Sequence, residues 1–231
     1  AYGYGEDEVA LMGMARYDAY GSAQTQKKIA FLPTWRSNIA GKIIPGTSTR
    51  EYVHHFKSTD FWKFYNALIN DERLLAAMER CGYTAEFYVH PAFEKQAGDF
   101  TGNALVAVGE GSADYERVLS ESALMVTDYS GVGFDFGYQR KPVVYSQYDS
   151  VFSGGHTYGE DSYFDYDTDG FGPVTRTLDD TVDAIIRYME SDCALEPEYR
   201  KRADAMFGFS DYQSSKRIFD AAAALSARRR A

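Results

Sequence analysis

Short apolar runs separated by longer stretches of helical periodicity constrain the fold of this chain more than any other feature. The runs, which have the length and composition of buried strands, are Lys28–Leu32, Tyr83–Val89, Leu105–Val108, Leu124–Val126 and Val143–Tyr145. Strands that alternate with helices are joined by right-handed crossovers, which produce a parallel sheet covered on both faces. The pattern therefore predicts a doubly wound, Rossmann-like α/β domain, in which ligands bind at the carboxyl ends of the strands.

Helical patterns fill the intervals between these runs. In Asp60–Arg80 one stripe of apolar residues is predicted to pack in the core, and Gly82 follows as a C-cap residue. That stripe consists of Phe61, Phe64, Tyr65, Leu68, Leu75 and Met78. Shorter helices are predicted at Asp114–Ser122 and Asp135–Gln139. From about residue 178 the chain is expected to be helical, in Leu178–Ser191 after an N-cap at Thr177, in Pro197–Phe207 and in Ser214–Ala227.

Size and charge narrow the possible partners. A chain of 231 residues, 45% of them hydrophobic, is predicted to form a single domain over residues 1–231. Its 24 Lys and Arg against 34 Asp and Glu give a net charge of -10, which repels nucleic acid and anionic membrane surfaces. Neither is an expected partner. A small anionic ligand is still compatible, because screening limits charge effects to about 8 Å at physiological salt.

Cysteine usage and hydropathy indicate the compartment. Cys81 and Cys193 are the two cysteines, too few for a zinc site or a disulfide scaffold. No run approaches the about 20 apolar residues of a membrane span, and the acidic opening of the sequence is unlike a signal peptide. These features predict a soluble, reduced, cytoplasmic protein with no direct membrane span.

The segment Leu124–Phe136 has the outline of a phosphate-binding turn. An apolar strand runs into small and polar residues and then into a new helix. Free backbone N–H groups at a helix N-terminus bind phosphate without net positive charge, and Ser130 and Gly131 would supply them. A capped turn with Ser130 as a plain N-cap is the alternative. The spacing of the glycines that follow misses the dinucleotide fingerprint by one residue.

The same segment resembles a family signature. Val126–Ser130, followed by Phe134–Phe136 and Lys141–Pro142, is similar to the TDYSS, FDF and KP motifs of CDP-glycerol glycerophosphotransferases, the teichoic-acid polymerase kind. Other stretches resemble family motifs in the same order: Leu11–Asp18 is similar to GxPRxD, Pro33–Arg36 to APTWR, His90–Pro91 to HP, and Tyr163–Asp165 with Gly172–Pro173 to YFD and PGP. Departures occur at Ala15, Gly131 and Phe171, and at residues 161–162 before the YFD stretch.

The resemblance implies one lobe of a two-lobed glycosyltransferase-B architecture, with this chain as the C-terminal, donor-binding lobe. The implied reaction is transfer of glycerol phosphate from CDP-glycerol to a lipid-linked acceptor of the teichoic-acid or capsule type. The acceptor would be held by the other lobe, so the isolated chain is expected to be incomplete for catalysis. No cofactor and no metal is implied. The full-length protein is expected at the inner face of the cell membrane.

The resemblance also implies the site residues. His90 is the expected catalytic residue, because it ends a predicted strand at the ligand-binding edge and can carry charge or exchange a proton. Arg36 is expected to bind phosphate with its guanidinium fork, and a surface ion pair with an acidic residue is the alternative. The substrate-binding residues are expected to be Thr34, Arg36, Thr127, Asp128, Tyr129, Ser130, Gly131, Asp135, Lys141 and Gly172.

Other candidates are weaker. His54 and His55 are interpreted as ordinary surface residues, and His156 as part of a solvated glycine-rich loop. Asp165–Gly170 begins like a calcium loop, but Arg176 stands where the loop requires a bidentate glutamate.

Two other functions are compatible with the same patterns. One is a nucleotide-binding module that performs no chemistry, and the other is a glycosyltransferase that uses a nucleotide sugar, since one fold serves both activities.

Overall fold

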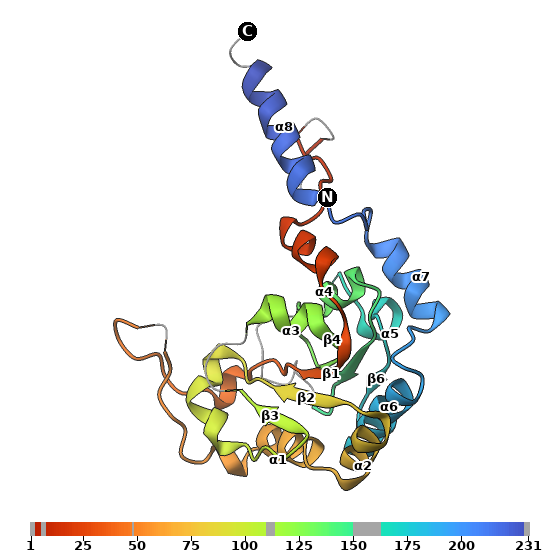
Figure 1. Cartoon of the computed structure of the whole chain (residues 1–231). Coiled ribbons are helices and arrows are strands. Elements are labelled where there is room, and N and C mark those ends of the chain that lie inside the picture. Colours follow the sequence, from red (N-terminus) through yellow and green to blue (C-terminus); the bar gives the residue numbers. More distant parts are fainter. Residues whose placement is uncertain (1–2, 6–7, 48, 110–113, 150–162, 229–231) are drawn as a thin grey trace.

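Six parallel strands form the centre of the molecule (Figure 1). The structure, a computed structural model, describes residues 3–5, 8–47, 49–109, 114–149 and 163–228. The strands are β1 (Gln26–Phe31), β2 (Thr84–Phe87), β3 (Val106–Val108), β4 (Ser122–Thr127), β5 (Val143–Ser146) and β6 (Val174–Thr175). Every neighbouring pair is parallel, so the predicted doubly wound sheet is confirmed. The two-residue strand β6 was not predicted, because it is too short to leave a hydrophobic pattern.

The strand order decides where a ligand can bind. The strands lie in the order β3-β2-β1-β4-β5-β6. The chain therefore builds outward from β1 through β2 to β3, and then returns to the centre to place β4 on the other side of β1. Connections leave β1 and β4 toward opposite edges of the sheet, which opens a crevice at their carboxyl ends.

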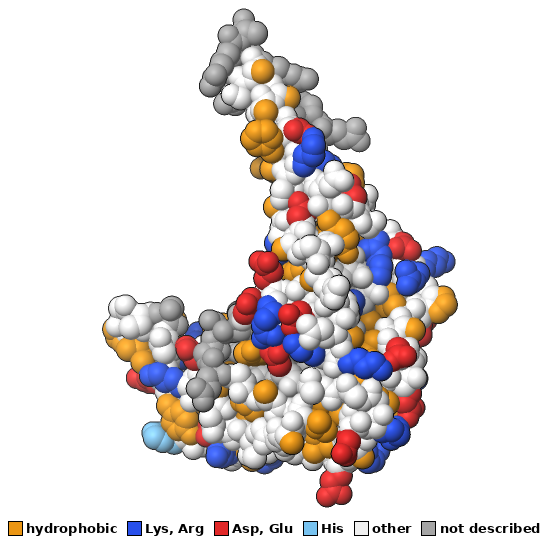
Figure 2. Space-filling model, viewed as in Figure 1, with side chains coloured by type: hydrophobic (Ala, Val, Ile, Leu, Met, Phe, Trp, Pro, Cys, Tyr) orange, Lys and Arg blue, Asp and Glu red, His pale blue; other side chains and the backbone are white. Residues whose placement is uncertain are grey.

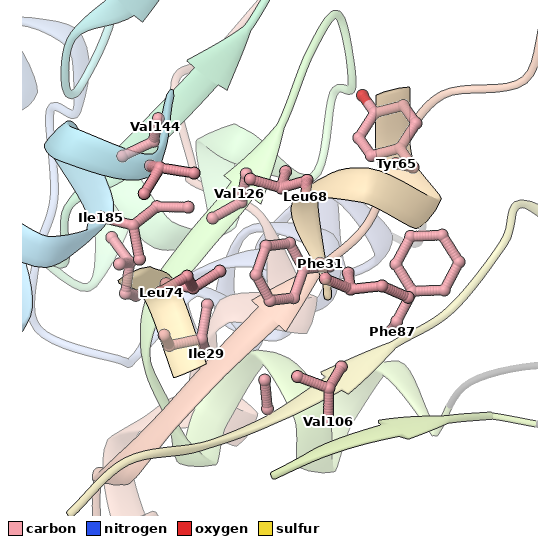
Figure 3. Close-up of a cluster of buried hydrophobic side chains, with 14 of the residues drawn as sticks. Ile29, Phe31, Tyr65, Leu68, Leu74, Phe87, Val106, Val126, Val144 and Ile185 are labelled. Carbon is pink, nitrogen blue, oxygen red and sulfur yellow. The ribbon is translucent and has the colours of Figure 1, made fainter. Parts of the chain in front are cut away.

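Side chains that alternate along each strand supply two separate cores. In β1, Ile29 and Phe31 pack against α1 (Asp60–Leu68), α2 (Glu72–Cys81) and α6 (Leu178–Glu190), the core drawn in Figure 3. Ala30, between them, faces the other core with Leu32. That second core is covered by η1 (Ala15–Ser22), α3 (Tyr115–Glu121), α4 (Gly133–Tyr138) and α7 (Pro197–Met206).

The helix predicted as Asp60–Arg80 is two helices, which corrects the sequence-based prediction. Helix α1 ends after Leu68, and α2 begins after Asp71, whose carboxylate accepts hydrogen bonds from the N–H groups of Arg73 and Leu74. An aspartate N-cap favours a new helix over continuation of the old one. The predicted end is confirmed, since Gly82 adopts the left-handed conformation at φ 73°.

The remaining helices follow their sequence signals closely. Thr177 caps α6 through its side chain, as predicted. The other described elements are α5 (Tyr166–Asp169), α8 (Ser214–Arg228) and the 3-10 helices η2 (Ser37–Ile39), η3 (Phe56–Ser58) and η4 (Pro91–Asp99).

Helix α8 stands away from the sheet and is attached through η1 (Figure 1). The Asp18 carboxylate accepts hydrogen bonds from the N–H groups of Ser214 (2.9 Å) and Ser215 (2.7 Å), at the beginning of α8. Apolar side chains lie uncovered along this projecting part, including Phe219 and Leu225, and Figure 2 shows such side chains on it.

Gly172 is required by the backbone of a neighbouring strand. A Cβ atom at this position would overlap the carbonyl oxygen of Val143 at the beginning of β5. The contact places Gly172 at the edge of the sheet where β5 and β6 begin, opposite the crevice.

We expect Gly172→Ala to destabilise the fold. Overpacking against backbone costs about 1–3 kcal/mol or more, which lowers the melting temperature of a domain of this size by about 2 °C or more. Gly98→Ala is the control, because no atom lies within 4 Å of a Cβ atom there. Thermal unfolding followed by circular dichroism measures both variants, and equal melting temperatures for the two would contradict the packing argument.

Candidate functional site

A pocket of about 450 Å³ lies at the crevice between the carboxyl ends of β1 and β4. Its volume is in the range of small-molecule sites. The lining residues come from η1, from the segments that follow β1, β2 and β4, and from α3 and α4. They are Arg16, Tyr20, Leu32, Pro33, Tyr88, His90, Tyr115, Leu119, Ser130, Gly131, Val132 and Asp135. The pocket therefore occupies the position that the fold reserves for ligands.

A buried carboxylate fixes the two loops at the crevice. Asp128, directly after β4, is fully buried, and its Oδ1 accepts hydrogen bonds from the N–H groups of Thr34 (2.9 Å) and Tyr129 (2.7 Å). Its Oδ2 accepts from Arg36 Nη2 (2.7 Å) and from the Tyr65 hydroxyl (3.2 Å). Burial, followed by the nearby Asp128 charge, raises the pKa of Tyr65, so its hydroxyl stays a donor. Asp128 thus holds the loop after β1 against the loop after β4.

Arg36 belongs to this network and is not a lining residue of the pocket. Its side chain is 3% exposed. Nε and Nη2 form a bidentate pair with Asp149 at 2.9 Å each, Nη2 also binds Asp128, and Nη1 donates to the carbonyl oxygen of Thr34 (2.7 Å). Four donor contacts are thereby engaged within the protein. The geometry matches the ion-pair alternative, with the guanidinium buried rather than at the surface.

The turn after β4 presents backbone donors to the pocket. Within the described part of the chain, the N–H groups of Ser130 and Gly131 have no acceptor. The Ser130 hydroxyl accepts a long hydrogen bond from Val132 N (3.4 Å). The carbonyl oxygen of Ser130 accepts a second hydrogen bond, from Gly133 N (3.1 Å). The helix itself begins at Gly133 with Val132 as N-cap. Ser130 therefore lies at the entrance of the turn and lines the pocket.

His90 lies across the pocket from this turn, beyond the end of β2. Its Nδ1 accepts a hydrogen bond from Ala92 N (3.1 Å), and the ring stacks on Trp35 with centroids 6.0 Å apart. A neutral imidazole whose Nδ1 accepts carries its proton on Nε2. The Ala92 contact thus fixes the tautomer of His90 and leaves Nε2 as the nitrogen that carries the proton.

Asp135 lines the pocket together with two residues that sequence reasoning did not select. Its buried carboxylate accepts from Arg16 Nε (2.8 Å), Arg16 Nη2 (3.0 Å) and the Tyr20 hydroxyl (2.6 Å). Arg16 lies in the stretch similar to GxPRxD, which was the available signal. Spacing could not reveal the pair, because the partners are separated by 119 residues.

Lys141 and Gly172 do not line this pocket, and a contact of either residue with substrate stays a prediction. Lys141 precedes β5, at the edge of the sheet opposite the pocket, and its Nζ donates to the carbonyl oxygens of Leu119 (3.4 Å) and Ser120 (2.5 Å). Burial lowers the pKa of Lys141 to about 8. Gly172 is close-packed on β5, as described above. In this structure, Lys141 and Gly172 of the KP and PGP stretches thus make contacts within the protein.

The other predicted residues support the site without lining it. The Thr127 hydroxyl donates to Leu32 O (2.7 Å) and ties β4 to β1. Tyr129 donates through its hydroxyl to Asp149 O (2.7 Å). Thr34 binds Asp128 through its backbone, and its buried Oγ1 has no partner among the described residues.

None of the weaker candidates that the structure describes lines the pocket. His54 and His55 are exposed, as predicted. His156 lies outside the described residues. Asp165 caps the short helix α5, and Arg176 pairs with Asp167 at 3.1 Å. Over the described ranges, no group of three or more His, Cys, Asp or Glu has an arrangement that would hold a metal, and no helix has the length and apolarity needed to cross a membrane.

We expect Arg36→Ala to act on stability. Removing one partner of a buried ion pair leaves Asp128 uncompensated and costs about 3–5 kcal/mol. Arg73→Ala is the control, because Arg73 pairs with Asp179 and Asp183 at the surface, where ion pairs contribute about 1 kcal/mol or less. Urea unfolding measures the free energy of both variants. An Arg36→Ala protein as stable as the parent would contradict the structural role.

Comparisons with known proteins show the family of this chain. The family model for CDP-glycerol:poly(glycerophosphate) glycerophosphotransferases matches residues 1–223. The minor teichoic acid biosynthesis protein GgaB of Bacillus subtilis (strain 168) is 34% identical over 220 residues, which cover 95% of this chain and 24% of GgaB. The teichoic acid glycerol-phosphate transferase of Staphylococcus aureus (strain NCTC 8325 / PS 47) is 28% identical over 161 residues, which cover 69% of this chain and 36% of that protein.

Solved structures show the same fold. A histidine-to-alanine variant of the wall teichoic acid polymerase TagF superimposes with a TM-score of 0.61 at 16% identity, over 95% of this chain and 53% of that one. A TagF variant soaked with CDPG gives a TM-score of 0.57 at 19% identity, over 95% of this chain and 51% of that one. The likeness confirms the predicted Rossmann-like α/β fold. This chain thus spans about a quarter of GgaB and half of TagF. From the match over residues 1–223 and the identity with GgaB, the chain belongs to the CDP-glycerol:poly(glycerophosphate) glycerophosphotransferase family.

Proposed function

We propose that this chain binds CDP-glycerol in the pocket between β1 and β4 and supplies the donor site for glycerol phosphate transfer in teichoic-acid synthesis. One observation carries the proposal. Family-like stretches that are far apart in sequence meet in this one pocket, contributing Arg16, Pro33, His90, Ser130 and Asp135. Nucleotide sites in doubly wound sheets typically lie at such a crevice, where the connections from two neighbouring strands leave in opposite directions.

The proposed arrangement places the diphosphate between the turn after β4 and His90. The N–H groups of Ser130 and Gly131 would donate to phosphate oxygens on one side. On the other side, Nε2–H of His90 would donate a hydrogen bond to the oxygen that bridges the two phosphates or to a phosphate oxygen of the departing CMP. This contact would stabilise CMP as the leaving group. Phosphoryl transfer depends mainly on such positioning and charge stabilisation, so a pocket of directed donors suits the reaction.

We further propose that residues 1–231 form one domain, the C-terminal lobe of a larger enzyme, and that another part of that enzyme holds the lipid-linked acceptor. In-line transfer requires both reactants to be oriented at once. A pocket of about 450 Å³ is large enough for one of them, the nucleotide. Because the proposed acceptor is lipid-linked, the full-length protein would work at the inner face of the cell membrane.

Nucleotide preference tests the proposal. We expect CDP-glycerol and CMP to raise the melting temperature more than UDP, UDP-glucose or GDP at equal millimolar concentration. A ligand present at ten times its Kd stabilises by about 1.4 kcal/mol, which corresponds to a shift of about 3–6 °C for a domain of this size. Equal shifts with all nucleotides would reject a cytidine site, and a larger shift with UDP-glucose would favour a nucleotide-sugar glycosyltransferase.

A second prediction separates the structural contact of His90 Nδ1 with Ala92 from the proposed phosphate contact of Nε2. His90→Asn keeps an acceptor for Ala92 N at the position of Nδ1 and removes Nε2. We expect the variant to melt like the parent and to bind CDP-glycerol about tenfold or more weakly, because a hydrogen bond to a charged group contributes about 1.5–3 kcal/mol. Cytidine, which has no phosphate, should bind equally to both proteins in titration calorimetry. Unchanged CDP-glycerol affinity would remove His90 from the site.

A further inference from the structure

The pocket contains a second cationic side chain, which the sequence did not single out. Among the described residues that line the pocket, Arg16 and His90 are the ones that can carry positive charge. The Arg16 side chain is half exposed, in contrast to the buried Arg36. An anion that enters the pocket therefore meets the guanidinium of Arg16.

The hydrogen bonds of Arg16 to Asp135 engage one edge of the guanidinium and leave the Nη1–Nη2 edge unused. Nε and Nη2 bind the two oxygens of Asp135 side by side, which occupies two of the five N–H donors. Both Nη1 hydrogens and the second Nη2 hydrogen have no acceptor among the described residues. A guanidinium held by a carboxylate on one edge presents the geometry that matches two phosphate oxygens on the other.

The segment that carries Arg16 is held firmly on both sides. Tyr17 stacks on Tyr138 of α4, with ring centroids 4.2 Å apart and planes at 25°, and meets the edge of the Phe207 ring. Asp18 binds the first N–H groups of α8. The buried Asp135 is itself fixed by the Tyr20 hydroxyl. These contacts orient Arg16 before a ligand arrives, which reduces the entropy lost on binding.

We propose that Arg16 is the arginine that binds the diphosphate of the donor, with Asp135 and Tyr20 as positioning residues. The inference rests on the proposed function and assigns to Arg16 the role that the sequence pattern suggested for Arg36. Because Asp135 balances the charge of Arg16, the pocket attracts phosphate through directed hydrogen bonds more than through net charge. This mode of binding is compatible with a chain whose net charge is -10.

Titration calorimetry with inorganic pyrophosphate, CDP-glycerol and cytidine tests the assignment. We expect Arg16→Ala to weaken pyrophosphate and CDP-glycerol about tenfold or more, and cytidine less than twofold. Arg16→Lys should also lose most of the affinity, because an ammonium cannot bind Asp135 at two atoms and present a second edge. Tyr20→Phe, which leaves Arg16 in place, should lose less affinity than either.

Arg73→Ala is the matched control. Arg73 is as exposed as Arg16, at 48% against 50%, and also pairs with carboxylates, but it lies on α2, which covers the other face of the sheet. Its removal changes the net charge equally and should leave all three affinities unchanged. If Arg16→Ala does not fold, Arg16→Lys provides the measurement.

The outcomes separate the inference from the proposed function. Parent-like pyrophosphate affinity in folded Arg16→Ala or Arg16→Lys overturns the assignment, and so does a parent protein that binds no pyrophosphate. Pyrophosphate binding that depends on Arg16, without preference for cytidine nucleotides, supports the assignment and rejects the proposed CDP-glycerol site.

Discussion

The geometry of the crevice depends on one buried carboxylate. Asp128 accepts four hydrogen bonds, from two backbone N–H groups, a guanidinium and a tyrosine hydroxyl, and none of its surface is exposed. A buried charge is tolerated when it is paired and fully hydrogen-bonded, and Arg36 with Thr34 and Tyr65 meets that condition. Because these partners come from segments after β1 and β4 and from α1, the network sets the distance between the two sides of the pocket.

The site therefore consists of two layers with different tasks. An inner layer around Asp128 and Arg36 is closed to ligand and gives the loops their shape. An outer layer, with Arg16, His90 and the Ser130 turn, faces the open space. In the sequence, the residues of the two layers show the same pattern, because both are polar residues that follow apolar strands. Burial distinguishes them, since an arginine at 3% exposure has little access to a ligand and one at 50% has ample access.

Most of the fold could be predicted from the sequence, and the part that could not has physical causes. Five strands and the end of α2 at Gly82 left clear periodic or capping signals. The break before α2 was missed because the apolar stripe continues across it, while the cap at Asp71 depends on a single side chain. His90 and Ser130, which follow strands in the sequence, line the pocket, and their contact with substrate stays a prediction. Lys141 does not line it, and the sequence could not show this because a motif does not tell at which edge of the sheet it lies.

The η1 segment connects the pocket with helix α8. Two residues apart, Arg16 reaches into the pocket and Asp18 holds the beginning of α8, the helix that projects from the body. Between them, Tyr17 packs on Tyr138 of α4. The same 3-10 segment thus supplies a side chain to the pocket and the hydrogen-bond acceptor for the first residues of α8, so a substitution that displaces η1 would alter the pocket and the attachment of α8 together.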